Sequence, residues 1–329
     1  MTDGPRRMKG HSLSDLAPSE TADLDEVLRG LRSPQKELPC KLFYDETGSR
    51  LFEQITELDE YYPTRSEMRI MRGAAAEMAS RFGPECLLIE YGSGNSSKTR
   101  ILLDNLEQPS GYVPIDICRE QLEQTAASLA EAYPQLTVLP IWTDYTRTID
   151  LRTPLPRCRR RLAYFPGSTI GNFVPDEARH FLAGIAETCG RGGGLLIGVD
   201  LKKDPLMLHR AYNDALGITA AFNLNILTRL NRELGANFAV DQFRHYAFYN
   251  PVFARVEMHL ISLIEQVVRI AQSTIHFERG ESIWTEASYK YNSHEFAALA
   301  ADAGWRHKQT WTDDRGLFSV QYFEVVGGS

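Results

Sequence analysis

The sequence has no segment suited to crossing or entering a membrane. None of its apolar runs approaches the roughly 20 residues that a spanning helix needs, and the N-terminal stretch MTDGPRRMKGHSLSD lacks the apolar centre of a signal peptide. Basic residues are not in excess either, since 36 Lys and Arg stand against 43 Asp and Glu, a net charge of -7. We therefore expect a cytoplasmic protein that binds neither a membrane nor nucleic acid.

Cysteine and histidine are sparse, and they lack the spacings of ligands. The five cysteines are scattered without a Cys-x-x-Cys pair, and the eight histidines show no His-x-x-x-His spacing. This pattern predicts reduced thiols rather than a disulfide framework, and no bound metal. The sequence also has no internal repeats or low-complexity tracts.

The 329 residues are instead organised by alternation of apolar runs and helical patterns. This alternation predicts an α/β fold with a doubly wound sheet. The expected strands lie near residues 86–91, 111–116, 136–143, 161–165 and 194–200. A final helix at 293–303 and a hairpin then complete the sheet.

The alternation stops after Asp200, where helical segments are followed by antiparallel strands. This change predicts an inserted α+β substrate-binding domain over residues 201–286, lying over the cofactor sheet. The expected cofactor-binding domain comprises residues 22–200 and 287–329. Residues 1–21 are expected to form a flexible N-terminus.

The first expected strand leads into a glycine turn, in the stretch CLLIEYGSGNSSKTR. A dinucleotide fingerprint would place a third glycine where Ser97 stands, so the turn fits a nicotinamide cofactor poorly. An acidic residue before Gly-x-Gly is favoured in methyltransferases that use S-adenosylmethionine, and Glu90 precedes Gly92 and Gly94 in this way. An ordinary connection between strand and helix is the alternative.

The next two strands also end on polar residues. Asp116 is placed to take both ribose hydroxyls of a cofactor, although a helix N-cap is the alternative role. Asp144 and Tyr145 end the third strand, where a carboxylate and a ring suit the amino group and the face of adenine. Three consecutive strand ends thus favour S-adenosylmethionine as cofactor.

Several long segments together resemble the histidine-specific methyltransferases of ergothioneine biosynthesis. They are LFYDETGSRLFEQITELDEYYPTR (42–65), EYGSGNSSKTR (90–100), PGSTIGNF (166–173), the region 200–225 and TEASYK (285–290). The resemblance covers about residues 30–329. It implies a Rossmann-like class I methyltransferase that trimethylates the α-amine of L-histidine to hercynine.

The resemblance also implies two sets of site residues. The cofactor set is Gly92, Lys98, Asp116, Asp144 and Tyr145. The substrate set is Tyr44, Tyr61, Asn172, Tyr212, Glu286 and Ser288, with Tyr44 and Asn172 as the catalytic pair. The strand ends point independently to Asp116, Asp144 and Tyr145.

Each substrate residue has a chemical role to fill. Asn172 can hold the carboxylate and the amine together, and Tyr212 can donate to the carboxylate. Glu286 and Ser288 lie two apart, hence on one face of an extended segment, and can bind the imidazole nitrogens. Tyr61 is expected at the ring and Tyr44 at the amine. The alternatives are a turn role for Asn172, a solvent-facing strand for Glu286 and Ser288, and core positions for the tyrosines.

One position departs from the family pattern. Tyr289 stands where a small residue commonly follows the serine, so it either points to the opposite face or reshapes the ring site. Specificity for another amino acid, or for a partly methylated histidine, therefore stays open. Two rival functions are a nicotinamide-dependent oxidoreductase and a non-catalytic S-adenosylmethionine sensor. We expect a monomer acting on a small molecule.

Overall fold

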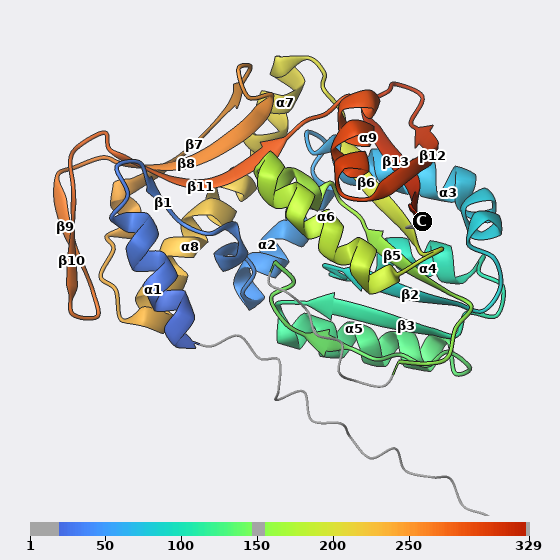
Figure 1. The fold of residues 1–329 in the computed structure, drawn as a ribbon. Helices are drawn as coiled ribbons and strands as arrows, with labels where there is room; N and C mark the ends of the chain where they lie inside the picture. The colour runs from blue at the N-terminus through green and yellow to red at the C-terminus, as the bar shows by residue number, and fades with distance from the viewer. Residues whose placement is uncertain (1–19, 147–154, 327–329) are drawn as a thin grey trace, which may run out of the picture.

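The computed structural model describes residues 20–146 and 155–326 (Figure 1). Its largest sheet has seven strands in the order β12-β13-β6-β5-β2-β3-β4. All neighbours are parallel except at β13, which is antiparallel to both β6 and β12. The strands are β2 (Cys86–Tyr91), β3 (Gly111–Asp116), β4 (Ile141–Trp142), β5 (Arg160–Phe165), β6 (Gly194–Asp200), β12 (Trp305–Thr312) and β13 (Phe318–Val325).

Helices cover both faces of this sheet, because alternate residues of the central strands point to opposite sides. Leu87 and Ile89 of β2 pack in a cluster with α6 (Pro175–Cys189) and α9 (Ser293–Asp302). Leu88 belongs to a second cluster with α3, α4 and α5. These three helices are Tyr62–Phe82, Ser97–Leu103 and Arg119–Ala132. The predicted doubly wound sheet is confirmed.

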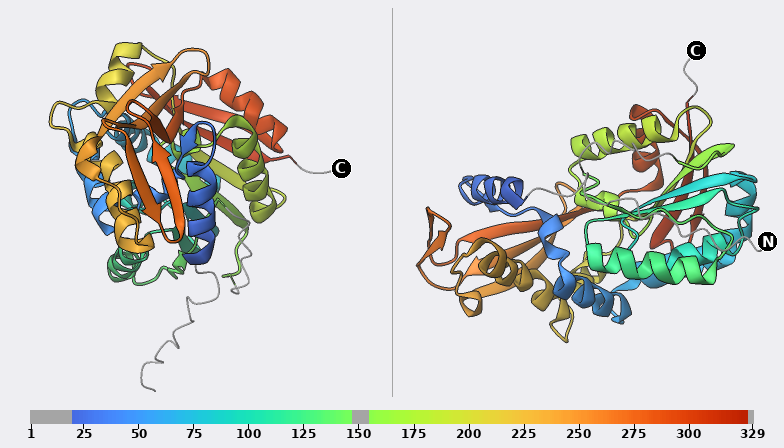
Figure 2. Two further views of the ribbon diagram at one scale, coloured as in Figure 1. Left: turned by 90° about the vertical axis from the view of Figure 1, so that its left-hand side faces the viewer. Right: turned by 90° about the horizontal axis from the view of Figure 1, so that it is seen from below.

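A smaller sheet extends to one side of the large one (Figures 1 and 2). Its order is β1-β11-β8-β7, with strands Lys36–Glu37, Ser282–Tyr289, Arg255–Ser262 and Phe243–Asn250. A two-stranded hairpin, β9 (Gln266–Ile270) and β10 (Ser273–Phe277), lies at its far end. The associated helices are α1 (Glu20–Leu31), the 3₁₀ turn η2 (Cys40–Phe43), α2 (Glu46–Glu57), α7 (Pro205–Tyr212), α8 (Ile218–Leu234) and the 3₁₀ turn η4 (Val240–Gln242).

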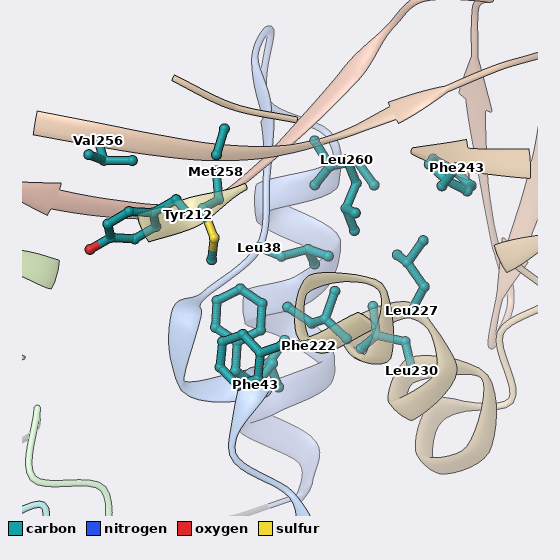
Figure 3. Packing of buried hydrophobic residues seen from close by; sticks show 14 of the residues in the cluster. Leu38, Phe43, Tyr212, Phe222, Leu227, Leu230, Phe243, Val256, Met258 and Leu260 are labelled. Carbon is teal, nitrogen blue, oxygen red and sulfur yellow. The ribbon is translucent and has the colours of Figure 1, made fainter. Parts of the chain in front are cut away.

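The core of the smaller unit joins the N-terminal segments to the insertion. Phe43 of η2 stacks on Phe222 of α8, with ring centroids 4.6 Å apart (Figure 3). Val27, Leu38 and further side chains up to Tyr62 belong to the same cluster. The sequence analysis assigned residues 22–62 to the cofactor-binding domain. Their buried side chains instead pack with the smaller sheet. Apolar periodicity shows that a segment is buried but not against which sheet.

Some element boundaries differ from those expected. The third strand was expected over 136–143 but is only β4, because Pro140 has no N–H for a sheet ladder. Helix α3 begins at Tyr62, since Pro63 occupies its first turn, where no N–H is needed. Of the expected flexible N-terminus, residues 1–19 lie outside the described residues, and residues 20 and 21 begin α1.

Two further findings concern composition. Among the described residues, no helix is both long and apolar enough to span a membrane. All five cysteines are free thiols, and three of them are buried.

Candidate active site

A cavity of about 570 Å³, including space open to solvent, lies where the smaller sheet meets the carboxyl ends of β5 and β6. Side chains from both units line it. All six predicted substrate residues are among them, namely Tyr44, Tyr61, Asn172, Tyr212, Glu286 and Ser288. Phe52, Thr219 and Met258 add apolar and hydroxyl surface. The cavity therefore brings together segments that are more than 240 residues apart in the sequence.

Strand β11 enters the cavity through a β-bulge. Its pairing with β8 shifts between Trp284 and Glu286, so Thr285 is the extra residue. The Thr285 hydroxyl donates to Asn223 Oδ1 of α8 at 2.7 Å, which ties the bulge to that helix. Beyond the bulge the strand alternates regularly, and Glu286, Ser288 and Lys290 all line the cavity.

The carboxylate of Glu286 has no hydrogen-bond or ion-pair partner within the described part of the chain. Burial raises its pKa from 4.5 to about 7, and the charge of Lys290 only partly opposes this. Glu286 is half-buried, and a carboxylate removed from water without a partner is costly. The cavity thus presents an acceptor that a ligand N–H would satisfy.

The two tyrosines expected at the substrate also face the cavity. Burial raises the pKa of Tyr44 well above its usual value, and the charge of Glu286 adds to this rise. Burial likewise raises the pKa of Tyr61, together with the nearby Tyr212. Both phenols therefore stay protonated at neutral pH and act as hydrogen-bonding groups rather than phenolate bases.

Asn172 is positioned by a tight turn, η3 (Thr169–Asn172), that lies against β11. A Cβ atom on Gly171 would lie 2.8 Å from the carbonyl oxygen of Tyr289, so only glycine allows this approach. Ser168, which precedes the turn, is held in the left-handed region with φ of 60°. The Asn172 amide makes no hydrogen bond to another described residue. It is therefore available to a ligand.

Sequence reasoning missed a buried charged cluster beside the cavity. Asp200, at the end of β6, accepts hydrogen bonds from Lys290, from Lys203 at 2.6 Å and from the Tyr62 hydroxyl at 2.8 Å. Asp200 and Lys290 both line the cavity. Two lysines outweigh the effect of burial and lower the pKa of Asp200. The signal for Lys290 was present, since it follows Ser288 by two positions on the same strand face.

The glycine turn and Asp116 lie together at the ends of β2 and β3. Gly92 has a φ of +72°, and a Cβ atom there would lie 3.5 Å from the hydroxyl of Tyr145. Asp116 is buried and accepts from the amides of Gly94 and Cys118 with separate oxygens, at 2.9 and 3.0 Å. Each oxygen keeps a second lone pair for a ribose hydroxyl. These residues fit the nucleoside end of S-adenosylmethionine.

Asp144 and Lys98, the remaining predicted cofactor residues, are engaged with other side chains. Asp144 accepts from Lys41 of η2 at 3.0 Å and from the Thr146 hydroxyl at 2.6 Å. Thr146 and Lys41 outweigh burial and lower the pKa of Asp144. Lys98 pairs with the buried Glu67. Sequence reasoning predicted neither partner.

Glu90, the acidic residue before the glycines, is engaged within the protein. Its carboxylate accepts from the Thr99 hydroxyl at 2.6 Å and from the Tyr112 hydroxyl. Burial raises the pKa of Glu90 to about 8 despite these two bonds. It therefore links β2, β3 and α4 within the protein.

Tyr289 points away from the cavity. Its hydroxyl accepts a hydrogen bond from Arg255 at 2.6 Å, and its ring belongs to the cluster under α6 and α9. It is not among the residues that line the cavity. The side chain at this position therefore does not narrow the cavity.

Residues 23–325 match the model of a family described as "Histidine-specific methyltransferase, SAM-dependent". The chain belongs to this family. It is 41% identical over 300 residues to the histidine N-alpha-methyltransferase of Mycolicibacterium smegmatis, with 90% of this chain and 92% of that protein covered. The corresponding enzyme of Mycobacterium tuberculosis is 42% identical over the same shares of both chains.

A fungal member of the same group is longer than this chain. Ergothioneine biosynthesis protein 1 of Neurospora crassa is 34% identical over 295 residues, which cover 84% of this chain and 32% of that protein. Membership of the family makes the protein an S-adenosylmethionine-dependent methyltransferase. An oxidoreductase, the alternative that the glycine turn left open, is thereby excluded.

Within the described residues, no group of three or more His, Cys, Asp and Glu side chains is arranged to hold a metal ion. The expectation that the protein needs no metal stays a prediction.

Proposed function

We propose that this protein transfers three methyl groups from S-adenosylmethionine to the α-amine of L-histidine, giving hercynine for ergothioneine biosynthesis. The observation that carries the proposal is the half-buried Glu286 carboxylate, which lines the cavity without a partner among the described residues. An imidazole N–H is a donor of the right kind for it. Two relatives named histidine N-alpha-methyltransferase align over nine-tenths of the chain.

The cavity has separate ends for the two parts of the amino acid. Glu286 and Ser288 lie on one face of β11 and would bind the ring, with Tyr61 nearby. Asn172 would hold the carboxylate and the amine through its amide oxygen and nitrogen, and Tyr212 would donate to the carboxylate. Tyr44 would lie at the amine.

Methyl transfer requires an unprotonated amine whose lone pair is directed at the methyl carbon. S-adenosylmethionine supplies that methyl group on a sulfonium when bound, and the residues at the ends of β2, β3 and β4 would hold it. Burial in the cavity favours the neutral amine over the ammonium. The protonated Tyr44 phenol and the Asn172 amide oxygen accept its hydrogen bonds and orient it, and the released proton passes to water. The second transfer repeats this step with one N–H fewer. The third starts from a neutral dimethylamine, which has no N–H to donate and releases no proton, and it gives the trimethylammonium product.

The other candidate is an α-N-methyltransferase for a different amino acid or for a partly methylated histidine. A side chain without a donor at the position of the imidazole N–H would leave Glu286 unpaired, a penalty of about 1 to 3 kcal/mol. Tyr289, which could have reshaped the site, lies outside it. Both observations favour histidine.

A direct experiment is to incubate the purified protein with S-adenosylmethionine and each of the twenty amino acids, and to follow the products by mass spectrometry. We expect a gain of three methyl groups on L-histidine and little change in the others. Preference for another amino acid, or a stop at one methyl group, would overturn the proposal.

We also propose that the protein acts as a cytoplasmic monomer, without a membrane or nucleic acid as partner. The net charge of -7 supports the absence of a nucleic-acid surface. Light scattering coupled to gel filtration tests the monomer, with the mass of 37.2 kDa expected for one chain.

A further inference from the structure

The ammonium group of Lys290 uses all three of its N–H donors inside the protein. Asp200 Oδ2 accepts at 2.8 Å, Ser288 Oγ at 2.7 Å and the Tyr212 hydroxyl at 3.1 Å. The side chain is only 1% exposed. Burial disfavours its charge, but the Asp200 carboxylate outweighs this and raises the pKa of Lys290. The group is therefore a permanent cation at neutral pH.

An ammonium has donors and no acceptor, so the direction of these bonds is fixed. Ser288 and Tyr212 must both accept from Lys290. Each hydroxyl has one proton, and that proton is then free to point elsewhere. Both residues line the cavity. One buried cation thus makes two cavity hydroxyls available as donors.

We propose that Lys290 is a positioning residue that turns Ser288 and Tyr212 into hydrogen-bond donors toward the amino acid, so that the site selects a neutral ring with one N–H and one bare nitrogen. The inference rests on the proposed function, since it assumes that histidine occupies this cavity. It adds a specificity-determining residue and fixes the protonation state of the substrate ring.

The two groups at the ring end then have opposite hydrogen-bonding character. Glu286, when ionised, only accepts, and Ser288 donates. A neutral imidazole matches this pair, because one nitrogen carries a proton and the other a lone pair. An imidazolium would instead place its second N–H on Ser288 Oγ, the same oxygen that already accepts from Lys290. Two cations sharing one oxygen in a buried site repel each other.

Tyr212 completes the arrangement at the other end. Its hydroxyl accepts from Lys290 and donates to the carboxylate of the amino acid, and it lies close enough to Ser288 to interact with it. The competing arrangement has Ser288 donating to Tyr212. The ring would then donate at both nitrogens and bind as an imidazolium. The two arrangements differ in the protonation of the ring, which is measurable.

Lys203 provides a matched control. It pairs with the same carboxylate, at 2.6 Å from Asp200 Oδ1, and also donates to the Tyr62 hydroxyl. It does not contact Ser288 or Tyr212 and is not among the residues that line the cavity. Lys203→Met and Lys290→Met each remove one ammonium from the cluster. Only the second removes the constraint on the two hydroxyls.

The test is ¹⁵N NMR of ring-labelled L-histidine bound to the full-length protein in the presence of S-adenosylhomocysteine. We expect one protonated and one bare ring nitrogen in the wild type and in Lys203→Met. In Lys290→Met we expect this single tautomer to be lost, with both nitrogens protonated or averaged by exchange. Two protonated nitrogens in the wild type would overturn the inference, as would an unchanged tautomer in Lys290→Met.

A binding measurement extends the test to unlabelled ligands. The two pyrrolylalanine isomers keep one ring N–H and have a C–H in place of one nitrogen or the other. We expect the wild type and Lys203→Met to prefer histidine over the better isomer by about tenfold or more, because the Ser288 proton loses its acceptor. The preference should fall toward equality in Lys290→Met, and an unchanged preference would contradict the inference.

These outcomes separate the inference from the proposed function. If the wild type binds no histidine in this assay, the proposed function fails and the ring state is not observed. If the wild type binds histidine as an imidazolium, the function stands and the role of Lys290 is wrong. The wild-type spectrum decides this even if Lys290→Met does not fold.

Discussion

The Lys290 ammonium lies 2.8 Å from the Asp200 carboxylate, and both side chains are 1% exposed. The pair joins the residue that follows β11 of the smaller sheet to the end of β6 in the larger one. Lys203 approaches the same carboxylate from the segment that follows β6. One aspartate therefore compensates two buried cations.

Replacing Asp200 with asparagine should destabilise the protein strongly, because two buried ammonium groups lose their counter-ion. We expect a loss of about 3 to 5 kcal/mol in the free energy of unfolding, measured by urea denaturation. Lys202→Gln is the matched control, since it breaks an exposed pair with Glu295 and should cost about 1 kcal/mol or less. Similar losses in the two variants would argue that the buried cluster contributes little.

Asp116→Ala should weaken binding of S-adenosylhomocysteine far more than it disturbs the fold. Two ribose hydroxyls would lose their acceptor, at a cost of about 1 to 3 kcal/mol. Calorimetric titration measures the affinity for S-adenosylhomocysteine. Asp116→Asn keeps one acceptor oxygen, so its affinity should lie between those of the wild type and Asp116→Ala. An unchanged affinity in the alanine variant would remove Asp116 from the cofactor site.

Asn172→Ala should nearly abolish methyl transfer while the variant stays folded. The amide is expected to orient both the carboxylate and the amine, and a small misplacement is costly in an in-line transfer. The initial rate with histidine and the unfolding midpoint are the two measurements. Near-normal turnover in a well-folded variant would leave Asn172 as a turn residue of η3.

Glu286→Ala should lower turnover of histidine and relax specificity toward aromatic amino acids. In the wild type, a ring without an N–H donor in the right place leaves Glu286 unpaired, which discriminates by about 1 to 3 kcal/mol. The measurement is the ratio of kcat/KM for histidine to that for tryptophan. Glu257→Ala is the control, because Glu257 belongs to the same sheet but does not line the cavity. If the ratio is the same in Glu286→Ala as in the wild type, Glu286 does not determine specificity for the imidazole ring.

The raised pKa of Glu286 also predicts how stability depends on pH. The folded state holds a proton on Glu286 up to about pH 7, whereas the unfolded chain releases it near 4.5, so stability is lost as the pH rises through this window. Glu286→Gln should remove that loss. As the pH rises from 4.5 to 8, the free energy of unfolding of the variant should increase by about 2 kcal/mol relative to that of the wild type. This figure is reduced for partial solvent screening. Urea denaturation of the unliganded proteins at several pH values measures this gain.

Glu257 supplies a control of opposite sign. Burial opposes its ionisation, but hydrogen bonds from His259 and Arg255 outweigh this and lower its pKa. Its contribution to stability is therefore present above its unfolded pKa and is lost as the pH falls through its folded pKa. Glu257→Gln should thus be less stable than the wild type at neutral pH, with a difference that shrinks in acid. A gain for both variants at high pH would show that the effect is not specific to Glu286.

The sequence predicted the large sheet well because its strands are continuous apolar runs followed by polar ends. Asp116 and Tyr145 could be placed at one edge of the sheet for this reason. The packing of Val27 to Tyr62 could not be predicted, because an apolar pattern does not name its partner. Resemblance to a family supplied most of the substrate set, which the cavity brings together.

The charged cluster shows a different limit. The spacing of Ser288 and Lys290 places them on one face of an extended strand, so Lys290 could have been found. The approach of Asp200 could not, since it depends on how β11 meets β6 in three dimensions. The bulge at Thr285 was also unforeseen, but Glu286 and Ser288 both follow it, so their shared face was predicted correctly.

Strand β11 ends at Tyr289, and two residues later Tyr291 forms an isolated backbone bridge with Leu201, just after β6. The amide of Tyr291 donates to the carbonyl of Asp200 at 3.2 Å, and Lys202 donates back to Tyr291 at 2.9 Å. The backbone positions of Glu286 and Lys290 are therefore held about 13 Å apart, the length of four extended residues. Neither residue can shift along the segment without the other. We therefore expect amino acids to be selected by the length of the side chain as well as by its chemistry, since one bond more than histidine has would displace either the ring or the amine.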